Sequence, residues 1–342
     1  MRQHIPTPHH FSIIHITLLC VALIVFSALC LFDGAVKIPA NAVWDILSGE
    51  QDSSANNAWR YIILYSRLPS LLTAIITGAA LSVCGLLMQS YFRNPLAGPS
   101  ILGITSGAHL GVSIVTLYIG GASLGHGLTT TGAAVIGAIT MLLLLLSVGR
   151  KVSAVTLLIV GMLCGYLTGA VVTLLNYHAT AENAHSLIVW GMGDFTNVSL
   201  KELPLYSSLL GVCIVATITL IKPLNAWMLG ESYARNLGIN LRQTRMLLIA
   251  ITGVIAAITT AYCGPISFIG LATPHIARMM ARTDNHRHLL PLTAMLGAIV
   301  ATACLWATTF PGDGRLLPLN ALTPVVGIPI ILYVVLKGRN RM

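Results

Sequence analysis

Long apolar segments recur along the whole chain and constrain its fold more than any other feature. Each is about 17 to 25 residues long, enough for a helix to cross a hydrocarbon core about 30 Å thick. The ten runs fall near residues 11–32, 68–90, 100–119, 128–148, 153–175, 204–221, 244–262, 265–281, 289–309 and 322–336. Because no separate soluble domain fits between them, we expect residues 1–342 to form a single all-α transmembrane domain with about ten membrane-spanning helices.

Charged residues are scarce, which excludes an ordinary soluble fold. Only 8% of the 342 residues are charged and 56% are hydrophobic, whereas about a quarter of the residues in a soluble domain are charged. No small-residue cleavage site precedes the turn at Asp33 and Gly34, so we interpret the first run as a retained helix and not as a signal peptide. All seven cysteines lie inside predicted spans or, for Cys263, directly after one, and each is interpreted as a small apolar residue.

The basic residues predict the orientation of the chain, because lysines and arginines that flank membrane spans stay in the cytoplasm. With the N-terminus inside, most of them fall on the cytoplasmic side: Arg2, Arg93, Arg150, Lys151, Lys222, Arg235, Arg242, Arg245, Arg278, Arg282, Arg287, Lys337, Arg339 and Arg341. Lys37, Arg60, Arg67, Lys201 and Arg315 fall outside. We therefore expect both termini to be cytoplasmic. The net charge of +9 is interpreted as a topology signal and not as nucleic-acid binding, since no basic stripe with interleaved aromatic residues is present.

The motifs missing from the sequence narrow the mechanism. The interiors of the predicted spans hold no Asp or Glu, which an ion-coupled secondary transporter usually needs. No phosphate-binding loop, HExxH pair or GxSxG motif is present, so no ATP hydrolysis, proteolysis or other intramembrane enzyme chemistry is predicted. His126, His178 and His185 are interpreted as solvated loop residues, and His286 and His288 as surface polar groups, so no metal ligands are predicted. If transport is powered, the energy comes from another subunit.

A polar, helix-forming stretch from residue 229 to 239 separates two of the apolar runs. Glu231 is placed to begin a short helix, since a carboxylate favours the N-terminal end of the helix dipole, and Gly238 can end it. A charged amphipathic element next to membrane spans is expected to face a partner on the water side. The alternative is a solvated loop with ordinary helix caps.

Two glycine-proline motifs suggest an internal repeat. Residues 98–103 open the third apolar run and residues 264–270 open the eighth. An offset of five spans places the motifs on opposite sides of the membrane, as an inverted repeat of five helices requires. Chance is the alternative, because proline is common in the first turn of a helix.

An ordered series of motifs from about residue 60 to 335 resembles the permease subunits of ABC importers for vitamin B12, ferric siderophores and haem. The motifs are Arg67-Leu68-Pro69, Gly78-Ala79-Ala80-Leu81, Gly85, Met88-Gln89, residues 93–99, Leu102-Gly103-Ile104, Ser106-Gly107-Ala108, Trp190, Gly193, Leu229-Gly230-Glu231, Ala234-Arg235, Leu237-Gly238, residues 264–278 and Leu289-Leu290-Pro291. This resemblance implies a homodimer in the bacterial inner membrane, with the translocation pathway at the subunit interface. It also implies two ATP-binding subunits, which use ATP and Mg, and a periplasmic substrate-binding protein. The chain itself is expected to bind no cofactor.

The resemblance also assigns roles to residues. The segment expected to dock in the ATPase subunits holds Leu229, Gly230, Glu231, Ala234, Arg235, Leu237 and Gly238. Gln89, Asn94 and Pro95 are candidates for the pathway or a gate; the alternatives are a helix-to-helix hydrogen bond for Gln89 and a structural turn for Asn94 and Pro95.

On the outer face, Arg67 matches a position that docks the binding protein through charge complementarity. The sequence departs from the family pattern at Ser70, where a second arginine is often seen, and at residues 305–309, which lack the usual Asp and Arg pair. Arg60 and Arg315 are candidates to substitute for the missing arginines.

The predicted function is therefore the import of a ferric siderophore from periplasm to cytoplasm, driven by ATP hydrolysis in partner subunits. Cobalamin and haem are the alternative substrates, because small and apolar pathway residues encode little about the cargo. An ion-coupled secondary transporter is favoured least.

Overall fold

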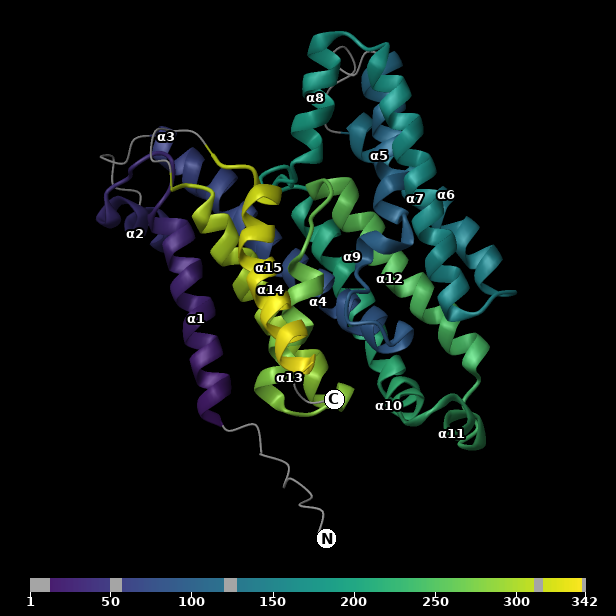
Figure 1. The fold of residues 1–342 in the computed structure, drawn as a ribbon. Coiled ribbons are helices and arrows are strands. Elements are labelled where there is room, and N and C mark those ends of the chain that lie inside the picture. Colours follow the sequence, from purple (N-terminus) through teal and green to yellow (C-terminus); the bar gives the residue numbers. More distant parts are fainter. Residues whose placement is uncertain (1–12, 50–56, 120–127, 311–315, 340–342) are drawn as a thin grey trace.

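The computed structural model describes residues 13–49, 57–119, 128–310 and 316–339, and within these ranges the chain is helical and contains no strand. Figure 1 shows a bundle of long helices with shorter helices at its two ends. The all-α prediction is confirmed.

The helices follow one another with short connections. They are α1 (Ile13–Phe32), α2 (Ala40–Ser48), α3 (Asn57–Tyr61), α4 (Leu68–Phe92), α5 (Ile104–Ile114), α6 (Leu128–Gly149), α7 (Ala154–Tyr177), α8 (Ala181–Gly191), α9 (Leu203–Ala216), α10 (Ile221–Leu229), α11 (Glu231–Asn236), α12 (Leu241–Cys263), α13 (Ile269–Ala281), α14 (His286–Ala307) and α15 (Leu319–Arg339). Four short segments of tighter or wider helix join some of them: η1 (Ile62–Arg67), η2 (Pro99–Leu102), η3 (Val115–Ile119) and η4 (Thr217–Leu220).

Seven helical stretches in the described residues are long and apolar enough to cross a membrane. They are Ile14–Phe32, Asn57–Phe92, Thr130–Gly149, Ala154–Tyr177, Leu203–Leu229, Leu241–Cys263 and His286–Ala307. Two further apolar stretches, Ile104–Tyr118 and Leu319–Tyr333, are shorter, and α13 has only 13 residues. Every predicted run contains a helix, so a multi-pass architecture is confirmed, while the number of ten spans and the inverted repeat stay predictions.

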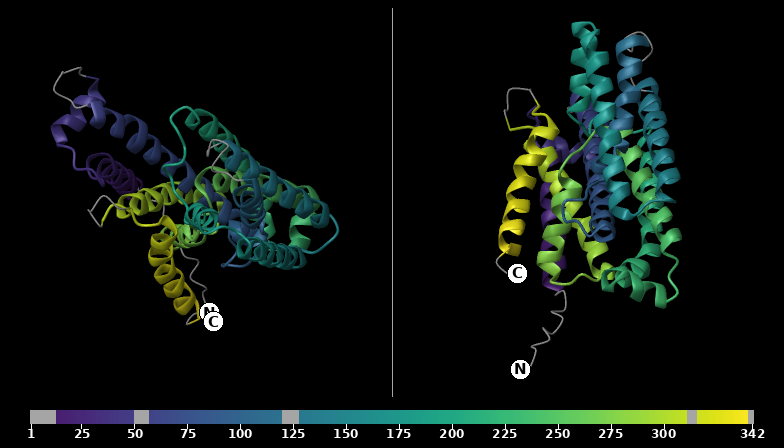
Figure 2. Two further views of the ribbon diagram at one scale, coloured as in Figure 1. Left: turned by 90° about the horizontal axis from the view of Figure 1, so that it is seen from above. Right: turned by 45° about the vertical axis from the view of Figure 1, so that its right-hand side comes forward.

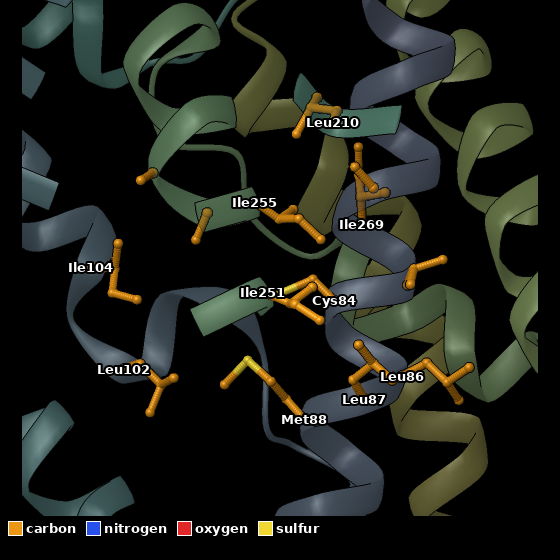
Figure 3. Close-up of a cluster of buried hydrophobic side chains, with 14 of the residues drawn as sticks. Cys84, Leu86, Leu87, Met88, Leu102, Ile104, Leu210, Ile251, Ile255 and Ile269 are labelled. Atoms are coloured by element: carbon orange, nitrogen blue, oxygen red, sulfur yellow. The ribbon is translucent and has the colours of Figure 1, made fainter. Parts of the chain in front are cut away.

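Helix α4 forms the centre of the bundle and is buried along most of its length. Its glycines allow very close packing: a Cβ atom placed on Gly85 would lie 1.7 Å from the carbonyl oxygen of Gly270 on α13, and one on Gly78 would lie 2.3 Å from that of Gly297 on α14. Small residues at helix contacts are the usual means of close helix packing in a membrane. Figure 3 shows Cys84 of α4 facing Ile251 of α12 in the apolar core, which also includes Leu87.

The short helices divide between the two ends of the bundle. Figures 1 and 2 place α10 and α11 at one end and α2, α3 and α8 at the other. We call these the α11 end and the α8 end. Helix α1 begins, and helix α15 finishes, toward the α11 end (Figure 1). The two ends therefore differ in the surfaces that they can offer to partners.

Candidate coupling site at the α11 end

The predicted short helix is present as α11 and is bounded by glycines. Gly230 precedes it with φ 129° and ψ 150°, and Gly238 follows it with φ 76°. Both conformations favour glycine because it has no Cβ. Asn240 then caps α12, since its side-chain oxygen accepts a hydrogen bond from the backbone N–H of Gln243 at 3.1 Å. Thus the local sequence separates α11 from both neighbouring helices.

Helix α11 touches the rest of the protein through a small part of its surface. Ala234 is its buried residue, whereas Tyr233 and the following Leu237 are half or more exposed. Arg235 donates a hydrogen bond to Glu231 at 2.7 Å, and both side chains are exposed. An exposed pair of this kind contributes about 0.5 kcal/mol or less to stability. The helix therefore offers a mixed apolar and charged surface, and its ion pair contributes little to the stability of the bundle.

Helix α10 is fastened to the end of α4 by Trp227. The indole Nε1–H of Trp227 donates to the carbonyl oxygen of Tyr91 at 3.1 Å, and the Arg93 guanidinium donates to the carbonyl oxygen of Trp227 at 2.5 Å. The rings of Tyr91 and Trp227 stack with their centroids 5.2 Å apart, and Arg93 lies 5.7 Å from the centroid of the Trp227 ring. Two opposed hydrogen bonds and a stacked pair fix the relative position of these helices.

The stretch after α4 is a tight turn. Arg93 ends the helix with φ 48°, and the side-chain oxygen of Asn94 accepts a hydrogen bond from the N–H of Leu96 at 2.9 Å. The imidazole Nε2 of His275 on α13 lies 2.8 Å from the carbonyl oxygen of Pro95. Asn94 thus stabilises the turn, and Pro95 connects it to α13. The gate assignment of these two residues stays a prediction.

Gln89 joins α4 to α13. Its side-chain oxygen accepts from Arg278 at 2.6 Å, its side-chain nitrogen donates to the carbonyl oxygen of Leu271 at 3.0 Å, and only 3% of the residue is exposed. These contacts agree with the interpretation of Gln89 as a helix-bonding residue. They do not test whether it also lines a pathway.

His286 is buried, which corrects the expectation of a surface polar group. Only 1% of this first residue of α14 is exposed. Its Nδ1 lies 2.7 Å from the side-chain oxygen of Asn225 on α10, and its Nε2 lies 2.7 Å from the hydroxyl of Ser90 on α4. Asn225 Oδ1 also accepts from the backbone N–H of His286, which identifies it as the oxygen and makes Nδ1 the donor. Nε2 of a neutral ring then accepts from Ser90.

The hydrogen bonds that join the end of α4 to α10 and α14 involve three residues that were not predicted from sequence as site residues: His286, Asn225 and Trp227. The relevant signal is spatial, because residues more than 130 positions apart meet here. A polar residue close to the end of an apolar run is ordinary in a sequence, and a lone histidine at a helix start gives no indication of burial. Arg278 was within a family motif, but its contact with Gln89 could not be read from spacing.

At the α8 end, Arg67 is half-buried and hydrogen-bonded to the backbone. Its guanidinium donates to the carbonyl oxygens of Leu31 at 2.6 Å and Val36 at 2.5 Å, and so holds the segment that follows α1. Arg60 on α3 is exposed, and Arg315 lies outside the described residues. Arg67 therefore has a structural role, and its docking role remains untested by these contacts.

A cavity of about 400 Å³ opens beside Arg67. Its lining includes Asp33 and Asp194, but both carboxylates already accept hydrogen bonds within the protein, from Trp306 at 3.1 Å and from the N–H of Thr196 at 2.9 Å, respectively. The cavity wall is otherwise largely apolar.

Fold and site together define the class: a multi-pass, all-α membrane protein that presents a short charged helix at one end of its bundle. The model of the FecCD transport family matches residues 20–337. The chain therefore belongs to the FecCD transport family, and its identification with the permease subunits of ABC importers for siderophores, haem and vitamin B12 is confirmed.

Individual relatives agree with this assignment. The vitamin B12 import system permease protein BtuC of Klebsiella pneumoniae is 35% identical over 277 residues, which cover 80% of this chain and 82% of that protein. The protein of the same name from Salmonella arizonae is 34% identical over 317 residues, which cover 92% and 94%. A solved ABC transporter assigned to the metal-chelate type, in an inward-facing conformation, has a TM-score of 0.82 and 27% identity, with 95% of this chain and all of that chain covered.

Proposed function

We propose that this chain is the permease subunit of an importer that carries a bulky metal chelate from the periplasm to the cytoplasm across a bacterial inner membrane. Two partner ATP-binding subunits hydrolyse ATP with Mg and dock on α11 and its flanking residues through Leu229, Gly230, Glu231, Arg235, Leu237 and Gly238, while the buried Ala234 packs the helix onto the bundle. The observation that carries the proposal is the exposed α11, whose charged and apolar side chains face away from the bundle while the neighbouring α10 is fastened to its central helix. The family assignment supports it.

The active unit is proposed to be a homodimer with the pathway between its subunits, and both termini in the cytoplasm. The positive-inside arrangement supports this orientation. The start of α1 and the finish of α15 lie toward the same end of the bundle as α11, which agrees with cytoplasmic termini (Figure 1). Gln89, Asn94 and Pro95 are proposed to contribute to the inner gate of this pathway.

A ferric siderophore is our first proposal for the cargo, and cobalamin is the second. The names of the BtuC relatives favour cobalamin. The absence of arginine at Ser70 and at residues 305–309 favours a binding protein with different docking charges, and hence a different cargo. Haem is the third candidate. The binding protein is proposed to dock at the α8 end through Arg67, with Arg60 and Arg315 in place of the missing arginines.

Uptake in a deletion strain tests both cargo and energy source. Labelled ferric siderophores, haem and cobalamin are compared in cells that lack this gene and in cells complemented with the natural chain or with Glu231→Lys. Loss of one substrate, restored by the natural chain and not by the variant, supports the proposal and identifies the cargo. Uptake that is lost in the deletion strain yet persists without any ATPase subunit would establish a secondary transporter instead.

A further inference from the structure

We propose that Trp227 and Asn225 of α10 are positioning residues that transmit a displacement of α11 to the end of α4 and to the turn at Asn94. This inference rests on the proposed docking of the ATPase subunits on α11. It adds the physical connection between that docking site and the candidate gate.

The first part of the connection is a single oxygen atom. The carbonyl oxygen of Trp227 accepts the N–H of Gly230, which directly precedes α11, at 3.1 Å, and also accepts the guanidinium of Arg93 at 2.5 Å. Arg93 is the residue immediately before Asn94. A displacement of α11 at Gly230 therefore pulls on a group that is bonded to the start of the turn.

The indole of Trp227 adds a second contact between α10 and α4. Its Nε1–H donates to the carbonyl oxygen of Tyr91, and the two rings stack, so that α10 cannot slide along α4 without the loss of both contacts. Arg245 of α12 donates to the Tyr91 hydroxyl at 2.5 Å, which holds that ring in place from its other side. The contact between Trp227 and Tyr91 is thus positioned by α10, α4 and α12.

Asn225 forms the second part, through His286. The side chain of His286 connects Asn225 of α10 with Ser90 of α4, and the Asn225 nitrogen donates to Asn285 at 2.9 Å. Ser90 is also 3.4 Å from Arg278, which binds Gln89. Because His286 and Ser90 are buried and hydrogen-bonded at these atoms, a partial break leaves buried polar groups without partners.

The connected helices are too tightly packed to absorb the displacement locally. Helix α4 meets α13 at Gly85 and α14 at Gly78 with no room for a Cβ atom. Close-packed interfaces tend to shift between discrete arrangements and do not deform continuously. A movement of α10 is therefore expected to move the end of α4 as a unit, together with the turn that follows.

The decisive experiment measures coupling, not activity alone. The complete complex with its ATPase and binding protein is reconstituted in liposomes, and the number of chelate molecules transported per ATP hydrolysed is determined. Trp227→Phe keeps a stacking ring and removes the N–H donor, and Asn225→Ala removes the contact with His286. Trp44→Phe, at an exposed position of α2, is the matched control. A second readout is the ATP-dependent reactivity of Leu96→Cys, at an exposed position of the turn, toward a water-soluble thiol reagent.

We expect transport per ATP to fall about five- to tenfold in Trp227→Phe, the factor that corresponds to the loss of one buried hydrogen bond. Asn225→Ala is expected to lower the ratio at least as far, because it removes the hydrogen bonds of Asn225 to His286 and to Asn285. ATPase co-purification and ATP hydrolysis remain, and Leu96→Cys loses its response to ATP. The inference would be overturned if the variants kept both the natural transport per ATP and the ATP-dependent labelling of Leu96→Cys. It would also be overturned if ATP hydrolysis and transport fell by the same factor. Either result would leave the proposed function intact. If the natural chain does not co-purify with an ATPase, the proposed function fails as well. If Trp227→Phe does not accumulate, Asn225→Ala decides by the same two readouts.

Discussion

At the scale of single residues, the burial of His286 depends on its three-dimensional surroundings and not on its neighbours in the sequence. Its sequence neighbours Asn285 and Arg287 are polar, and this pattern is typical of a surface loop. In the structure it lies between Asn225 and Ser90, almost without solvent exposure. The arrangement depends on α10, α4 and α14 meeting at one place, and no local pattern encodes such a meeting.

Gly85 provides a stability prediction. Gly85→Ala is expected to destabilise the protein by roughly 1–3 kcal/mol or more, because the added methyl group would collide with the Gly270 backbone, which cannot rotate away as a side chain can. Thermal unfolding of the detergent-purified protein measures the effect. Gly211→Ala in α9 is the control, since nothing lies within 4 Å of its added Cβ. Equal unfolding temperatures for the two variants would contradict the close contact of α4 and α13.

Arg67 provides a prediction about docking. Charge reversal in Arg67→Glu is expected to weaken the association of the binding protein about tenfold or more, because it changes the charge at the α8 end and also releases the carbonyl oxygens of Leu31 and Val36. Co-purification of the ATPase subunits should not change. Titration of the binding protein onto the reconstituted complex measures the first association and co-purification measures the second, with Lys201→Glu as a control for charge. If neither association changes, Arg67 is confined to its structural role.

At the scale of helices, length and hydropathy predicted the elements well, because a membrane span must be both long and apolar. Each predicted run contains a helix, and α11 lies where Glu231 and Gly238 indicated. Helices α2 and α8 were not predicted, since they are short and lie outside the apolar runs. The continuous stretch Asn57–Phe92 was also missed, because the π-helical turn at η1 joins α3 to α4 across residues that carry a basic side chain.

The boundary at Gly230 provides a prediction for α11 as an element. Insertion of two residues after Gly230 is expected to abolish coupled transport, since it lengthens the connection between Trp227 and the helix and breaks the hydrogen bond that the Ala234 N–H donates to the carbonyl oxygen of Gly230 at 3.0 Å. The bundle should stay folded, because only Ala234 of α11 is buried. The uptake assay and membrane accumulation together test this. The same insertion after Gly49, which has no atom within 4 Å of an added Cβ, is the control.

At the scale of the whole molecule, the sequence predicts the protein family and its fold better than it predicts the transported substrate. Many of the motifs that identify the family lie at glycine contacts, where close packing restricts the choice of residues, and at the α11 end, where we propose that the ATPase subunits dock. The cavity beside Arg67 is mainly apolar, and its acidic groups are already bonded within the protein. Small and apolar linings accept many chelates, so the cargo could not be predicted from these residues.

The orientation of the whole chain provides the last prediction. A membrane-impermeant thiol reagent added to spheroplasts is expected to label Lys201→Cys, which lies beyond α8, and to leave Arg235→Cys on α11 unlabelled until the membrane is permeabilised. Both positions are exposed in the structure. The reason is the excess of lysine and arginine near the α11 end, which resists translocation during insertion. The natural chain measures background labelling of its own cysteines. The reverse pattern would place α11 in the periplasm, where no ATP-hydrolysing partner could reach it, and would remove the coupling role of this helix.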